Sequence, residues 1–251
     1  MTKQNKLPDF FINAFYESKF RVNLFIVKAS GRIIQDNTAL LSLMNDIKTL
    51  SLAGIRIILI YGFGNAMDVA AEQRGVKVTK HNTHRVTDAP TLELLKQVVC
   101  GSMSTRISSM MAKTQIDGLN LNAVPHNWLS LSLWDKEEKG ADFGYVGEIN
   151  DVHSRPIIRM LKNYNVVAVP CVATMADGQH CNMNADRLAM HLANALHTDK
   201  LIFLSNVDGV LDKDKKTIPL ITDDNLQNLI NVMKWFSRNS LKDSIKVTHL
   251  L

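Results

Sequence analysis

A lysine that leaves a buried strand is the first residue whose position suggests chemistry. Lys28 closes the apolar run Val22–Lys28 and is followed by the small-residue turn Ala29-Ser30-Gly31. Backbone N–H groups in such a turn can approach an anion, and the ammonium group neutralises its charge. This combination indicates phosphate binding, although a lysine often ends a strand simply to reach water.

A glycine-containing turn follows the second apolar run. Ile55–Tyr61 continues directly into Gly62-Phe63-Gly64 and then into a helical segment. Glycine permits a tight strand-to-helix turn, and the start of the helix offers unpaired N–H donors. The pattern differs from the dinucleotide-binding fingerprint, because the third glycine and the later acidic residue are absent. A plain structural turn is the competing interpretation.

Three further segments place polar residues at the ends of apolar ones. In Arg85-Val86-Thr87-Asp88, the arginine can pair with a carboxylate through two hydrogen bonds, or form an ordinary surface ion pair. Asn182-Met183-Asn184-Ala185-Asp186 opens a helix, where Asn184 can be an N-cap and Asp186 a first-turn acid. The strand Lys200–Ser205 leads into the polar turn Asn206–Asp212, which suits a nucleotide base or ribose, or a hairpin.

The elements that must position these residues alternate along the chain, as strand and helix do in an α/β fold. Ligands of such a sheet bind at the carboxyl ends of the strands, where the motifs fall. The predicted strands are Val22–Lys28, Ile55–Tyr61, Val166–Val172 and Lys200–Ser205, and the predicted helices include Thr38–Leu52, Ser154–Asn163 and Asn184–Leu196.

Other segments interrupt this alternation. Leu119–Val124, Trp128–Trp134 and Tyr145–Asn150 alternate polar and apolar residues, which predicts antiparallel hairpin structure. Thr87 is the predicted cap of a long helix. Pro8–Ser18 predicts an amphipathic helix that packs on its own domain or docks on another subunit; the spacing leaves both open.

Composition excludes several classes of protein. Of 251 residues, 46% are apolar and 21% are charged, as in a soluble globular protein with a sizeable core. The apolar runs are too short to cross a bilayer, and no secretory signal is apparent, so we expect a cytoplasmic protein without membrane partners. The net charge of +5 is scattered, which favours anionic small substrates over nucleic acid. Three cysteines without paired spacing predict free thiols.

Taken in order, these motifs resemble those of the amino-acid-kinase superfamily, specifically N-acetylglutamate kinases and the kinase-like domain of N-acetylglutamate synthases. The resemblance extends over roughly residues 20–250. It includes a lid segment, Asp142-Phe143-Gly144-Tyr145-Val146-Gly147-Glu148-Ile149, and a second phosphate-binding lysine, Lys246, in Ser244-Ile245-Lys246-Val247.

The resemblance implies a three-layer αβα fold, with a mostly parallel open sheet between helices and a β-hairpin lid. It implies one continuous kinase-like domain made of an N-terminal helical arm over residues 1–20, an amino-acid-binding lobe over 21–175, and a short nucleotide-binding lobe over 176–251. The helical arm resembles one that joins dimers into rings, so we expect a homodimer or higher homo-oligomer.

The implied reaction is phosphorylation of the γ-carboxylate of N-acetylglutamate by ATP and Mg²⁺, a step of arginine biosynthesis, with the metal held by the ATP phosphates. The implied catalytic residues are Lys28, Asp186 and Lys246. The implied acceptor-binding residues are Gly62, Phe63, Gly64, Arg85 and Asn182. The implied nucleotide-binding residues are Gly31, Ser205, Asn206, Val207, Gly209 and Leu211.

Two departures from the family pattern give weight to an alternative. Ser30 replaces a glycine of the first loop, and Phe63 replaces the central glycine of the second. The alternative is a catalytically inactive arginine sensor of the synthase type. Retention of Lys28, Asp186 and Lys246 favours the kinase, and arginine inhibition of that kinase is a further hypothesis.

Overall fold

The computed structural model describes residues 23–64, 66–81, 84–205, 209–212, 214 and 216–222. Its centre is a five-stranded sheet in which every neighbouring pair is parallel. The strand order is β11 (Lys200–Leu204), β1 (Leu24–Ala29), β2 (Arg56–Tyr61), β8 (Val166–Pro170) and β5 (Gly118–Asn120). The predicted helical arm, Pro8–Ser18, lies outside the described residues.

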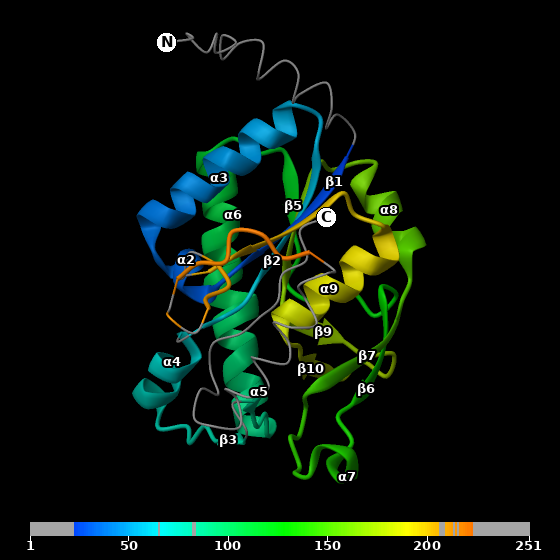
Figure 1. The fold of residues 1–251 in the computed structure, drawn as a ribbon. Helices are drawn as coiled ribbons and strands as arrows, with labels where there is room; N and C mark the ends of the chain where they lie inside the picture. Colours follow the sequence, from blue (N-terminus) through cyan, green and yellow to red (C-terminus); the bar gives the residue numbers. More distant parts are fainter. Residues whose placement is uncertain are drawn as a thin grey trace, which may run out of the picture.

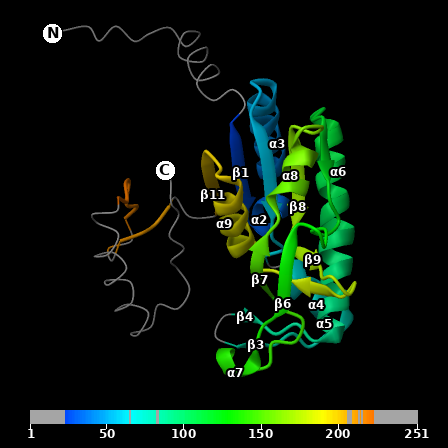
Figure 2. The same ribbon diagram turned by 90° about the vertical axis from the view of Figure 1, so that its right-hand side faces the viewer.

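Helices cover both faces of this sheet (Figures 1 and 2). α3 (Asn37–Leu52) and α6 (Ser104–Lys113) lie on one face, and α9 (Ala185–Leu196) lies on the other, in contact with α8 (Ser154–Leu161). The central strands are continuous apolar runs because both of their faces are buried. The predicted three-layer α/β fold is confirmed.

One long helical rod runs beside the sheet. It consists of α5 (Ala89–Leu95), the π-helix η1 (Lys96–Met103) and α6, with right-handed helical backbone at each junction. The prediction of Thr87 as its cap is wrong, because the Asp88 carboxylate accepts the Thr91 N–H at 2.9 Å. Two shorter helices follow the glycine turns: α2 (Gly31–Gln35) and α4 (Ala66–Arg74).

Three small antiparallel hairpins extend from the sheet. The largest pairs β6 (Leu129–Leu133) with β7 (Gly147–Val152) and carries α7 (Lys136–Lys139) at its tip (Figure 1). The others pair β3 (Lys80–His81) with β4 (His84–Arg85), and β9 (Val172–Thr174) with β10 (His180–Asn182).

The predicted hairpin is therefore present as β6–β7, but one segment predicted to belong to it lies in the main sheet instead. Leu119–Val124 does not form antiparallel structure, because β5 pairs in parallel with β8 at the edge of the main sheet. An edge strand has one open side and is shorter than a central one, so its alternating pattern resembles that of a hairpin strand.

The core lies on both faces of β1, β2 and β8. Its fully buried side chains include Trp128, Tyr61 and Ile58. Cys171 and Cys181 are buried and Cys100 is half-buried, and all three are free thiols, as predicted. None of the described helices combines the length and the apolar character needed to cross a membrane.

Candidate functional site

Lys28 and Asp186 meet at the carboxyl end of the sheet. Lys28 is near the end of β1, and Asp186 is in the first turn of α9, whose N-cap Asn184 accepts the N–H groups of Asp186 and Arg187. Nζ of Lys28 lies 2.8 Å from Oδ1 of Asp186, and the two side chains are 11% and 13% exposed. Burial lowers the pKa of Lys28, whereas the nearby carboxylate favours the charged ammonium.

The two glycine turns press against each other. A Cβ atom on Gly31 would lie only 2.3 Å from the carbonyl carbon of Phe63 and from the nitrogen of Gly64. Gly64 has a φ of +50°, a conformation that favours glycine. A Cβ atom on Gly62 would lie 3.6 Å from the Cβ atom of Ala185. Backbone from both loops and the start of α9 therefore borders one space beside Lys28.

Arg85 is held by an aromatic ring and a carboxylate. Its guanidinium carbon lies 5.4 Å from the centre of the Phe63 ring, and its Nη1 atom lies 2.8 Å from Oδ1 of Asp68 in α4. The Arg85 side chain is only 8% exposed. Phe63 thus points along the second loop toward Arg85 and stacks on it. This geometry fixes the orientation of the guanidinium group.

Asn182 joins the arginine motif to the lid segment. Its Nδ2 atom donates to Oγ1 of buried Thr87 at 3.0 Å, and its backbone N–H donates to the Tyr145 carbonyl at 2.8 Å. Thr87 in turn exchanges backbone hydrogen bonds with Phe143 and Tyr145. Within the described residues, Oδ1 of Asn182 is buried and has no hydrogen-bond partner. A buried acceptor of this kind is suited to a ligand N–H group.

An aromatic and histidine cluster joins the two hairpins next to Arg85. The Trp134 and Phe143 rings, from the lid, lie 5.0 Å apart, and His84 lies 5.1 Å from Trp134. His81 contacts Phe143 at 5.8 Å, and the Lys139 ammonium lies 5.1 Å from the Trp134 ring. These contacts pack the β6–β7 hairpin against the β3–β4 hairpin that carries Arg85.

The residues predicted to bind the nucleotide are described in part. The Ser30 N–H donates to the Leu204 carbonyl at 3.1 Å, which brings the end of β11, and Ser205 after it, beside the first loop. Leu211 forms an isolated antiparallel bridge with Thr217, and Gly209 lies two residues before it. Asn206, Val207 and Lys246 fall outside the described residues.

The predicted site residues thus form two connected groups. One contains Lys28, Gly31 and Asp186; the other contains Arg85 and Asn182; Gly62, Phe63 and Gly64 lie between them. Sequence reasoning missed Asp68 as the partner of Arg85. An acid in the first turn of the helix after Gly62-Phe63-Gly64 was the available signal.

Within the described residues, no group of three or more His, Cys, Asp or Glu side chains could hold a metal ion. Cys171 lies close enough to Lys28 for their charges to interact, but burial raises its pKa to about 12, so its thiol stays protonated near neutral pH.

Comparison with known proteins agrees with this geometry. The sequence model of the amino acid kinase family matches residues 23–249. An acetylglutamate kinase from Campylobacter hominis is 30% identical over 230 residues, covering 91% of this chain and 80% of that protein. An amino-acid acetyltransferase from Shewanella oneidensis is 26% identical, over 87% of this chain and 49% of that protein.

Solved structures share the fold. N-acetylglutamate synthase from Neisseria gonorrhoeae superposes with a TM-score of 0.76 at 23% identity, covering 93% of this chain and 52% of that one. The chain therefore spans about half the length of the acetyltransferase and synthase relatives, and most of the kinase relative. It belongs to the amino acid kinase family.

Proposed function

We propose that this chain transfers the γ-phosphoryl group of ATP to the γ-carboxylate of N-acetylglutamate, giving an acyl phosphate and ADP. The observation that carries the proposal is the buried Lys28–Asp186 ion pair between the two glycine loops. The name of the Campylobacter hominis relative, acetylglutamate kinase, supports the choice of acceptor. A carboxylate is ionised at neutral pH, so the reaction needs no general base, only positioning and neutralisation of charge.

The acceptor would bind between Arg85 and Asn182. Arg85, held by Phe63 and Asp68, would present its guanidinium group to the α-carboxylate. The buried Oδ1 atom of Asn182 would accept the N–H of the acetamido group. Backbone N–H groups of the second glycine loop would orient the γ-carboxylate. These contacts would bring the nucleophilic oxygen toward Lys28.

The nucleotide would bind along the first loop and the end of β11. Lys28 would neutralise the transferring phosphoryl group, and the N–H groups around Gly31 would contact phosphate oxygens. Within the described residues, the Ser30 hydroxyl is buried and has no hydrogen-bond partner, which fits a phosphate oxygen beside it. Mg²⁺, carried by the ATP phosphates, would supply further neutralisation of charge when bound.

The remaining assignments extend the same proposal. Asp186 would orient Lys28 together with Lys246, which acts from the leaving-group side. Ser205, Asn206, Val207, Gly209 and Leu211 would surround the nucleotide. Residues 21–175 would form the acceptor lobe and residues 176–251 the nucleotide lobe of one continuous domain. The enzyme would work in the cytoplasm as a homo-oligomer.

A second candidate is a catalytically inactive domain that binds arginine. It is favoured by the similarity to the Shewanella oneidensis acetyltransferase and by Phe63, which stacks on Arg85 where the kinase pattern has a glycine. The two candidates differ in one measurable respect: only the kinase turns ATP over.

The test is ADP release from ATP and Mg²⁺ in the presence of N-acetylglutamate, with N-acetylaspartate and glutamate as competing acceptors. We expect turnover with N-acetylglutamate and its loss in Lys28→Ala. Lys48→Ala is the matched control, because the Lys48 ammonium bonds only the exposed Gln115 side chain among the described residues. Arginine binding without turnover would instead support the sensor.

A further inference from the structure

We infer that Arg106 is a positioning residue for the nucleotide side of this site. It lies in α6, outside the residues assigned to substrate, and fixes the short helix α2 that follows the first glycine loop. The inference rests on the proposed function, because it concerns how the Lys28–Gly31 loop is held for ATP. It adds a residue to which neither the motifs nor the family resemblance assigned a role.

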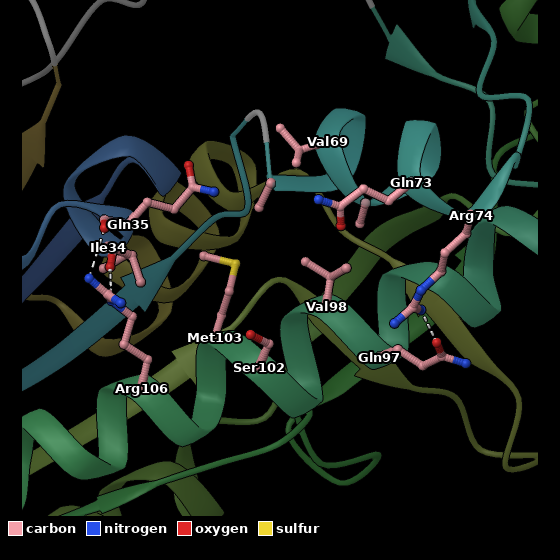
Figure 3. Close-up of a pocket in the computed structure, with 12 residues that line it drawn as sticks. Ile34, Gln35, Val69, Gln73, Arg74, Gln97, Val98, Ser102, Met103 and Arg106 are labelled. Atoms are coloured by element: carbon pink, nitrogen blue, oxygen red, sulfur yellow. Dashed lines mark hydrogen bonds between the residues drawn. The ribbon is translucent and has the colours of Figure 1, made fainter.

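The contacts of Arg106 all fall at the carboxyl end of α2. Its Nε atom donates to the Ile34 carbonyl at 2.7 Å, and its Nη2 atom donates to the Gln35 carbonyl at 2.8 Å and to the Asn37 side chain at 2.5 Å. Figure 3 shows the guanidinium group turned toward both carbonyls. The last carbonyls of a helix have no intrahelical partner, so a cation with several donors satisfies them well.

The opposite end of α2 leaves little room for movement. Gly31, its first residue, touches the backbone of Phe63 and Gly64, which would lie 2.3 Å from a Cβ atom there. The backbone N–H of Ser30, just before Gly31, donates a hydrogen bond to the Leu204 carbonyl. A five-residue helix is therefore held between the second loop at one end and Arg106 at the other. A displacement at the Arg106 end would be transmitted directly to Gly31.

Packing alone does not fix α2 on the side that faces α4 and η1. A groove of about 440 Å³ lies there, bordered by Gln35, Val69, Gln73, Val98, Ser102 and Met103, among others (Figure 3). The buried Ile34 side chain sets how deeply α2 lies on the core. Ile33 is half-buried against the same core, so α2 has two adjacent apolar contacts. The guanidinium contacts add a constraint at the carboxyl end of the helix, which this packing does not supply.

The expected signature is a selective loss on the nucleotide side. In Arg106→Ala we expect KM for ATP to rise about tenfold, as for the loss of charge-assisted hydrogen bonds. KM for N-acetylglutamate should stay within about twofold, because Arg85 and Asn182 belong to other elements. Arg106→Lys keeps the charge but lacks the planar fork of donors, and should restore part of the ATP affinity.

Arg74→Ala is the matched control. Arg74 is an exposed arginine that lines the same groove and donates a hydrogen bond to the Gln97 side chain in η1, with no hydrogen bond to α2 among the described residues. A second measurement does not depend on turnover: amide hydrogen exchange over residues 31–36, which should become at least about tenfold faster in Arg106→Ala and stay unchanged in Arg74→Ala.

The outcomes separate this inference from the proposed function. If the wild-type protein shows no turnover, the proposed function fails, and exchange over residues 31–36 still decides whether Arg106 holds α2. If the wild-type protein is active and Arg106→Ala keeps both its KM for ATP and its amide protection, the inference is overturned. A lower melting temperature with an unchanged KM for ATP would overturn it equally.

Discussion

The ammonium group of Lys28 and the carboxylate of Asp186 form an ion pair of 2.8 Å that is almost closed to solvent. Lys28 is fixed near the carboxyl end of β1, a strand paired on both sides, and Asp186 is fixed by the capped first turn of α9. Each partner thus comes from a rigid element. Such a pair holds a cation at a defined point, which is what transfer of a phosphoryl group requires.

The first prediction concerns this pair. Asp186→Asn leaves a mostly buried ammonium beside a neutral amide and should lower the free energy of unfolding by about 3 kcal/mol. Lys28→Met should lower kcat by about 10³-fold, because the transferring group loses a preorganised cation. Urea denaturation and steady-state kinetics measure the two effects.

The double variant Lys28→Met/Asp186→Leu is the control for the stability effect. It removes both charges and should be more stable than Asp186→Asn while remaining inactive. Equal stability of the wild-type protein and the three variants would show that the ion pair contributes nothing to folding.

The second prediction concerns Arg85. In Arg85→Gln the acceptor loses a charge-assisted contact, so KM for N-acetylglutamate should rise about 30-fold while KM for ATP stays within about twofold. Initial rates measured over both substrate concentrations separate the two constants. A rise in both would mean that Arg85 supports the whole site and not the acceptor alone.

The third prediction is a pH dependence of stability that originates at Asp68. Burial raises the pKa of Asp68, but the hydrogen bonds and charges of Arg85 and Lys80 outweigh it, and the net shift is downward. The folded state therefore binds this proton less readily than the unfolded state. The contribution to the free energy of unfolding is present above the ordinary pKa of aspartate, about 3.9, and is lost as the pH falls through the lowered value.

Urea midpoints of the wild-type protein and of Asp68→Asn, compared from pH 7 to pH 3, measure this contribution. The difference between the two proteins should shrink toward the acid end. Asp46→Asn, at an exposed position of α3, is the control and should follow the wild-type curve. A constant difference across the range would contradict the assignment to Asp68.

The fourth prediction uses two glycines in different surroundings. Gly31→Ala would place a methyl group against the backbone of Phe63 and Gly64 and should destabilise the protein by about 2 kcal/mol and weaken ATP binding. A Cβ atom added at Gly101, in η1, would have no neighbour within 4 Å, so Gly101→Ala should stabilise the protein by about 0.5 kcal/mol. Thermal unfolding and nucleotide titration compare them, and similar results at both positions would argue against close contact of the loops.

The parallel sheet was predictable because its central strands are buried on both faces. Runs such as Ile55–Tyr61 and Val166–Pro170 are continuous in apolar residues, and each is bounded by polar or glycine-containing turns. The positions of the glycine loops, Lys28 and Asp186 could be predicted for the same reason, since each lies at the end of a strand or at the start of a helix.

Other features depended on contacts that a local pattern does not contain. Thr87 and Asp88 are both good helix caps, and the choice between them follows from Asn182, which binds the Thr87 hydroxyl. Asp68 and Arg106 look like ordinary surface charges on helices. Their roles appear only when the fold brings Arg85 and the end of α2 beside them.

The hydrogen bonds of Thr87 have a consequence for how the acceptor enters. Thr87 is tied to Phe143 and Tyr145, Tyr145 to Asn182, and Trp134 to Val146, all through backbone atoms. The base of the β6–β7 hairpin is therefore hydrogen-bonded to Thr87 and Asn182. Only the tip, over residues 135–142, could move without breaking those bonds. We therefore expect an acceptor to enter past the tip of the hairpin, because the base of the hairpin stays bonded to Thr87 and Asn182.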